Sequence, residues 1–159
     1  MSFNQRPQKE YTPDVFTDSK LKLYGKPLQE GGWATSIRVK MVGNNPAIEA
    51  STGLKDKKGR LIRIDTPMSP VTFDQLLSVI EIVASSKVAQ SFELENWGHA
   101  FNWDASQQKS VRAEERSVLS RFSVERTEAG LIRLSVANKF NTVTVDFVQD
   151  DWHKWMKDG

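Results

Sequence analysis

Apolar and polar residues alternate in several segments between positions 20 and 64, and this period of two predicts β-strands. In the segment 35–42, Ile37, Val39 and Met41 alternate with Ser36, Arg38 and Lys40. Shorter alternating or apolar segments cover residues 20–26, 47–51 and 61–64. Turn-forming residues at 30–32 and 43–46 and a charged loop at 53–59 separate them. The first half of the chain therefore predicts four antiparallel strands.

A different period begins near residue 70 and predicts an amphipathic helix. Pro67 and Pro70 end the preceding strand because proline has no N–H group to donate to a sheet. Ser69 can cap the helix, and Pro70 suits its first position. Apolar residues then recur at spacings of three and four, and they are Phe73, Leu76, Leu77, Ile80 and Val83.

The second half repeats strand-like segments at 91–97, 119–126, 131–136 and 142–147. The segment 101–104 is a candidate partner strand for 91–97. Residues 105–116 are strongly polar, and we interpret them as a loop or a surface helix. After Asp150 or Asp151 we expect a short final helix, whose apolar face carries Trp152, Trp155 and Met156.

The two halves also resemble each other in sequence. Residues 59–64 (GRLIRI) are similar to residues 130–134 (GLIRL), and residues 71–75 are similar to 145–149. We therefore predict an α+β fold made of two antiparallel β-sheet units, each followed by a helix. Residues 1–19 are polar and without a period, which predicts a flexible N-terminal arm. Residues 20–159 are predicted to form a single domain of two halves, 20–86 and 87–159.

The residue content narrows the classes of function. The chain has no cysteine and two histidines, His99 and His153, and neither histidine has a second one at a metal-ligand spacing. It has no phosphate-binding glycine motif and no nucleophile-elbow motif. We therefore predict that the protein is not an enzyme and uses no cofactor or metal. No apolar run approaches the roughly 18 residues that span a bilayer, so we expect a cytoplasmic protein, in the host cytoplasm if viral.

The net charge of +2 says little about partners, but the position of the cations says more. In the strands of the first half, Lys22, Arg38 and Arg63 all lie on the polar face by alternation. A cationic face beside aromatic rings is suited to single-stranded nucleic acid, because phosphates need neutralising charge and unstacked bases need flat rings. The alternative is that such cations only keep the sheet soluble and discourage edge pairing. The candidate binding residues are Lys20, Lys22, Tyr24, Trp33, Arg38, Lys40, Lys55, Lys57, Lys58, Arg60, Arg63, Trp103, Lys139 and Phe140.

The aromatic cluster of the second half leaves two interpretations open. Trp97, Phe101 and Trp103 lie within a few residues of each other. Core packing is expected for at least one of them, and base stacking is the sharper hypothesis for Trp103.

The second half carries a resemblance to a known family. Residues 122–126 (FSVER), 131–134 (LIRL) and 143–145 (VTV), followed by Asp150-Asp151-Trp152-x-x-Trp155, resemble the last strands and helix of Whirly and positive-cofactor-four single-stranded-DNA-binding proteins. The resemblance implies curved sheets that bind unpaired strands and helices that pack at a subunit interface, and hence a homo-oligomer. The small size, the lack of cysteine and the polar N-terminus are also similar to phage-encoded DNA-binding proteins.

These observations predict a non-catalytic single-stranded-DNA-binding protein of low sequence specificity that acts in phage or host transcription or replication. RNA stays open as the ligand. The alternative is a protein-interaction module that binds RNA polymerase, a replication protein or another partner, with Trp152, Trp155 and Met156 as its anchor. A virion or assembly protein is a third hypothesis.

Overall fold

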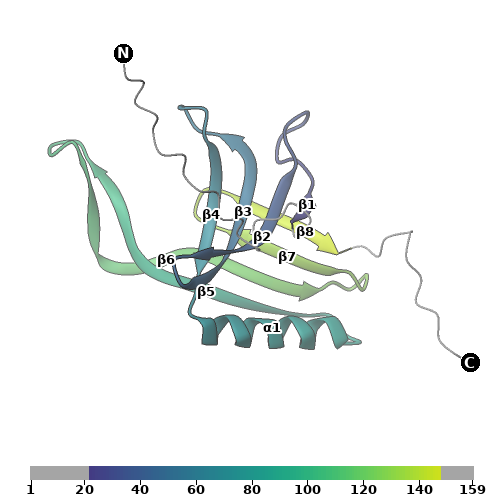
Figure 1. The fold of residues 1–159 in the computed structure, drawn as a ribbon. Helices are drawn as coiled ribbons and strands as arrows, with labels where there is room; N and C mark the ends of the chain where they lie inside the picture. Colours follow the sequence, from purple (N-terminus) through teal and green to yellow (C-terminus); the bar gives the residue numbers. More distant parts are fainter. Residues whose placement is uncertain (1–21, 148–159) are drawn as a thin grey trace, which may run out of the picture.

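The computed structural model describes residues 22–147, which form two four-stranded antiparallel sheets and one helix (Figure 1). Sheet 1 contains, in spatial order, β1 (Leu23–Gly25), β2 (Thr35–Val42), β3 (Asn45–Lys55) and β4 (Leu61–Pro67). The helix α1 (Pro70–Ser85) connects the sheets. Sheet 2 contains β5 (Gln90–Asp104), β6 (Lys109–Arg126), β7 (Ile132–Ala137) and β8 (Thr142–Phe147).

The predicted α+β fold of two strand–helix units is wrong. Strands make up 59% of the described part of the chain, so the protein is mostly β, and that part contains a single helix. The strand content is higher than predicted because β6 replaces the expected loop or surface helix at 105–116 from Lys109 onward. The final helix expected after Asp150 or Asp151 and the flexible arm expected at residues 1–19 lie outside the described residues.

The helix α1 forms where its sequence signals predict it. Ser69 is the N-cap, and its hydroxyl accepts a hydrogen bond from the Thr72 amide at 3.2 Å, while Pro70 occupies the first turn. At the other end, Arg126 of β6 donates to the carbonyl oxygens of Val83 and Ala84 at 3.2 and 2.6 Å. These bonds satisfy helix carbonyls that have no partner within the helix and fix α1 to sheet 2.

The hydrophobic core lies between the inner faces of the two sheets and α1. Register explains which residues enter it: Ile37 pairs with Ala50 and Ala50 with Ile64 in sheet 1, while Phe122 pairs with Val136 in sheet 2. Paired residues of neighbouring strands point to the same side of a sheet. The buried apolar residues of this core are Ile37, Ile48, Ala50, Ile64, Met68, Leu76, Val83, Phe122, Val124, Leu134, Val136, Val143 and Val145.

A small cluster of polar groups around Ser120 connects the sheets within this core. The hydroxyl groups of Thr66 (β4) and Ser120 (β6) lie 2.9 Å apart, and Ser120 also donates to the Asp65 carbonyl at 3.1 Å. Asn96 of β5 donates to the same Ser120 oxygen. Because each buried polar group has a partner, the cluster carries no large desolvation penalty. It fixes β4 beside β6.

Strands β5 and β6 extend well beyond sheet 2 as a two-stranded hairpin, which Figure 1 shows as a curved projection on the β4 side. We define the β5–β6 ribbon as residues 97–104 and 109–118 with the turn between them. β7 pairs with β6 only from Arg121 to Arg126, so within the described chain the ribbon pairs with no third strand. The sequence suggested that the segment 101–104 is a partner strand of 91–97. The structure shows instead that 101–104 is the end of β5 itself.

Candidate nucleic-acid interface

Strand register collects several predicted binding residues on one side of sheet 1. Tyr24 pairs with Ser36, Arg38 with Glu49 and Glu49 with Asp65. These pairs lie on the side opposite the core, which we call the outer face of sheet 1. Strand alternation adds further members, so the outer face consists of Lys22, Tyr24, Ser36, Arg38, Lys40, Ala47, Glu49, Ser51, Arg63 and Asp65.

A buried glutamate occupies the middle of this face. The Glu49 residue is only 3% exposed, and its carboxylate accepts hydrogen bonds from Arg38 Nε at 2.7 Å and from Lys40 Nζ. Lys40 Nζ also lies 2.8 Å from Asp65 Oδ1. The side chains of Arg38 and Lys40 are 15% and 18% exposed. Two of the cations predicted to bind phosphate are thus largely neutralised by their own neighbours.

The protonation equilibria of this cluster follow from burial and pairing. Burial by itself raises the pKa of Glu49, but hydrogen bonds from Lys40 and Arg38 outweigh it, so the pKa of Glu49 is lowered. Burial likewise lowers the pKa of Lys40, but hydrogen bonds to Asp65 and Glu49 outweigh it, so the pKa of Lys40 is raised. Both groups are held in their charged forms at neutral pH.

Arg63 and Tyr24 are the more open members of the outer face. Arg63 Nε lies 4.0 Å from Glu49 Oε1, a weak contact, and its side chain is 50% exposed. The Tyr24 ring is also exposed. These two residues offer a guanidinium and a flat ring to solvent, whereas Arg38 and Lys40 do not.

A second cation–aromatic pair lies at the end of sheet 1 where β3 leads into the hairpin loop. Lys55 Nζ sits 5.3 Å from the centroid of the exposed Trp33 ring. Gly53 permits this approach: its φ is +71°, and a Cβ there would lie 2.4 Å from the Trp33 carbonyl oxygen. The loop before β2 can therefore lie against β3 and place Trp33 over Lys55.

The hairpin between β3 and β4 presents the remaining basic residues of the first half. The Asp56 carboxylate accepts hydrogen bonds from the Lys58 and Arg60 amides and pairs with the Arg60 side chain at 2.8 Å. Lys57 and Lys58 are exposed at the tip. Of the predicted loop cations, Arg60 is engaged within the turn.

The other candidates are dispersed. Lys139 and Phe140 lie in the turn between β7 and β8, with Lys139 Nζ 4.8 Å from the exposed Phe140 ring. Trp103 lies near the tip of the β5–β6 ribbon. Lys20 lies outside the described residues. The structure thus brings Lys22, Tyr24, Arg38, Lys40 and Arg63 together on one face, with Trp33 and Lys55 at its end, and does not add the second-half candidates to that face.

The sequence-based prediction missed two features of this region. The central position of Glu49 could have been found from the alternation of β3, which places Glu49 on the polar side, but its pairing with Arg38 needed the register. The prediction that Trp97, Phe101 or Trp103 packs in the core is wrong, since all three are exposed. Their alternate spacing on one strand was the available signal.

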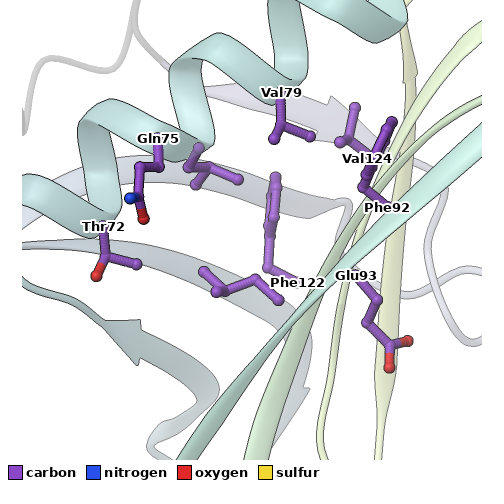
Figure 2. Close-up of a pocket in the computed structure, with 9 residues that line it drawn as sticks. Thr72, Gln75, Val79, Phe92, Glu93, Phe122 and Val124 are labelled. Atoms are coloured by element: carbon purple, nitrogen blue, oxygen red, sulfur yellow. The ribbon is translucent and has the colours of Figure 1, made fainter.

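A small apolar cavity lies between α1 and strands β5 and β6 (Figure 2). Its volume is about 200 Å³, and its wall includes Val79, Phe92 and Phe122. The Glu93 carboxylate at its edge points away from the helix in Figure 2. Sites for small-molecule ligands usually exceed about 300 Å³ and hold convergent polar groups. This cavity therefore does not have the character of an active site.

Residues 22–147 contain no group of three or more His, Asp or Glu side chains placed to hold a metal ion. No helix within that range is long and apolar enough to cross a bilayer.

Comparison with known proteins gives no match: no family model, no curated protein and no solved structure is significantly similar to this chain. The resemblance to Whirly and positive-cofactor-four proteins therefore stays a prediction from the sequence.

Proposed function

We propose that this protein binds single-stranded nucleic acid without catalysing a reaction, and that the outer face of sheet 1 is the binding surface. The observation that carries the proposal is the joint placement of Tyr24 and Arg63 on that face, with Trp33 and Lys55 at its end. Flat exposed rings accept bases of any sequence, which accounts for low sequence specificity. A role in transcription or replication, and DNA as the preferred strand, rest on the sequence resemblance.

The buried Glu49 cluster refines the proposal by reducing the number of available charges. Arg38 and Lys40 are paired, which leaves Lys22, Lys55, Lys57, Lys58 and Arg63 to meet phosphates. The salt dependence for single strands is about −0.7 per phosphate contact, so a slope of log K against log salt no steeper than about −3.5 is expected. Stacking on the rings must then supply much of the affinity.

The test is a titration of fluorescently labelled oligo(dT), followed by anisotropy at several salt concentrations. Tyr24→Ala should weaken binding roughly tenfold, because base–aromatic stacking contributes about 1–3 kcal/mol per base. Arg63→Gln should reduce the salt slope by about 0.7. Arg133→Gln is the matched control, because Arg133 lies in a sheet of the same kind but pairs with Asp146 and Glu125 on the outer face of sheet 2. Wild-type protein that fails to bind oligo(dT) at low salt would reject the function, and Tyr24 and Arg63 variants that match the control would reject the surface.

One observation favours the alternative of a protein-interaction module. Helix α1 packs against the sheets through Leu76 and Val83 but exposes Val71, Leu77 and Ile82 to solvent. Exposed apolar side chains on a surface element can contribute to a protein interface. The anchor predicted at Trp152, Trp155 and Met156 lies outside the described residues. A partner such as RNA polymerase would be retained at high salt, whereas oligo(dT) would be released.

A further inference from the structure

The β5–β6 ribbon carries an exposed row of aromatic side chains. Trp97, Phe101 and Trp103 alternate along β5 and therefore point to one side of the strand. They are 51%, 70% and 67% exposed. Successive rings in such a row are separated by multiples of about 6.8 Å, twice the rise per residue of a strand. Exposed rings in such a row indicate a surface that another molecule covers.

Within the part of the chain that the structure describes, the ribbon also has no supporting strand, which favours a binding partner. A two-stranded hairpin is marginally stable in water unless a further strand or a packed element supports it. Within residues 22–147 no third strand pairs with this part of β5 and β6. At the tip, the Asp104 carboxylate accepts hydrogen bonds from the Ser106 amide and hydroxyl at 2.9 and 2.6 Å. These hydrogen bonds hold the turn at the tip of the ribbon in one conformation.

The chemistry of the ribbon indicates what the partner is. Arg112 pairs with Phe101 and Arg116 with His99, and Arg116 Nη2 donates to the Trp97 carbonyl at 3.3 Å. Paired residues share a side, so the guanidinium groups lie beside the aromatic row. Aromatic rings with arginines beside them are suited to unstacked bases, because a base can stack on a ring and on a guanidinium group. The acidic residues equal the basic residues in number, because Asp104, Glu114 and Glu115 accompany Lys109, Arg112 and Arg116. Stacking, rather than net charge, is then the source of binding.

We propose that the aromatic row of the β5–β6 ribbon stacks bases of the same single strand that the outer face of sheet 1 binds. This inference rests on the proposed function. The ribbon leaves the body of the molecule beside β4, where Ser120 contacts Thr66, and Arg63 lies on that same strand. Figure 1 shows the ribbon curving toward the end where the β3–β4 hairpin lies. By alternation the aromatic row lies on the same side of β5 as Glu95, to which Trp97 Nε1 donates at 2.8 Å, so a strand that crosses the outer face of sheet 1 reaches the row by passing around the edge at β4.

The experiment compares a short oligo(dT), which the outer face alone can hold, with a longer one that reaches the ribbon. The test variant combines Phe101→Ala and Trp103→Ala, and the matched control combines Asn102→Ala and Val111→Ala, a cross-strand pair on the opposite side of the same ribbon. The test variant should bind the short oligonucleotide as wild type does. It should bind the longer one at least about tenfold more weakly, with an unchanged salt slope, because stacking is lost and no cation is removed. The control should match wild type on both lengths.

Several results would overturn the inference, and they separate it from the proposed function. A test variant that binds the longer oligonucleotide as tightly as wild type excludes the ribbon, while short-oligonucleotide binding by wild type still supports the outer face. Equal loss for both lengths would place the whole site on the ribbon and reject the division between two surfaces. Unchanged binding together with a smaller oligomer in sedimentation would identify a second copy of this chain as the partner. If wild type binds neither length, the proposed function fails and the inference fails with it.

Discussion

The outer faces of the two sheets carry the same kinds of charged residue but differ in how far these residues are buried. On sheet 1, Arg38 and Lys40 surround Glu49, which is buried. On sheet 2, Arg121 contacts Glu93 and Glu95, and all of these side chains are between 36% and 53% exposed. The distances of the close ion pairs overlap, from 2.5 to 2.8 Å on sheet 1 and from 2.6 to 3.3 Å on sheet 2. The difference lies in burial.

Burial changes what each ion pair contributes. Exposed pairs are solvated, compete with water and contribute roughly 0–1 kcal/mol. A buried pair whose partner is removed leaves a charge without solvent or counter-charge, which costs about 3–5 kcal/mol. The comparison teaches that a count of cations in the sequence overestimates the number available to a phosphate. On sheet 1 the cations of β2, Arg38 and Lys40, are paired with Glu49 and Asp65, so these charges are not available to a ligand.

The largest expected effect is on stability at the centre of sheet 1. Glu49→Gln should lower the free energy of unfolding by roughly 3 kcal/mol, because Arg38 and Lys40 lose their common anionic partner. Urea denaturation followed by circular dichroism measures it. A loss below about 1 kcal/mol, the value of an exposed pair, would show that the two faces do not differ as described.

The pH dependence of this variant gives a sharper form of the same comparison. The pKa of Glu49 is lowered in the folded protein, so its charged form contributes stability above the ordinary value of 4.5 and loses it as pH falls through the lower folded value. The stability gap between wild type and Glu49→Gln should therefore be constant between about pH 6 and 8 and close at strongly acidic pH. Lys40, with its raised pKa, contributes below its ordinary 10.5 and loses that contribution only as pH rises through the higher folded value. Urea midpoints over a pH series test both limits; a gap that persists at acidic pH would assign the effect of Glu49→Gln to packing.

The smallest effect is expected on sheet 2. Glu93→Gln removes a contact to Arg121 at 3.2 Å, and because the pair is exposed, the cost should be roughly 0–1 kcal/mol. High salt should abolish the difference from wild type, since the screening length falls to about 3 Å at 1 M. The Glu49→Gln difference should survive the same salt. Thermal unfolding with and without salt makes the comparison, and equal salt sensitivity of the two variants would contradict it.

Local sequence signals were sufficient for elements that bury one face. The strand predicted at 35–42 is β2, and the strand predicted at 142–147 is β8, with the same bounds. Helix α1 begins at Pro70 after the predicted cap Ser69. In these segments the apolar residues face the core. Their spacing in the sequence therefore matches the period of the strand or helix.

The ribbon shows why another part of the fold was not predictable. Residues 109–118 are exposed on nearly every side chain, so no alternation of apolar and polar residues marks them as a strand. Their conformation depends on hydrogen bonds to residues 97–104 across the hairpin. Without that strand in view, the polar segment 105–116 favoured a loop or a surface helix, and the strand content of the fold was underestimated as a result.

The order of residues by itself determined the strands of the core, the start of α1 and the side of each strand on which Arg38, Lys40 and Arg63 lie. Only the tertiary structure decided how open that side is, because it placed Glu49 of β3 directly beside Arg38 of β2, buried Glu49 and left only 15% of the Arg38 side chain exposed. Alternation depends on neighbours along the chain, which the sequence contains. Charge pairing and burial depend on neighbours across the sheet, and those exist only once the strands have found their register.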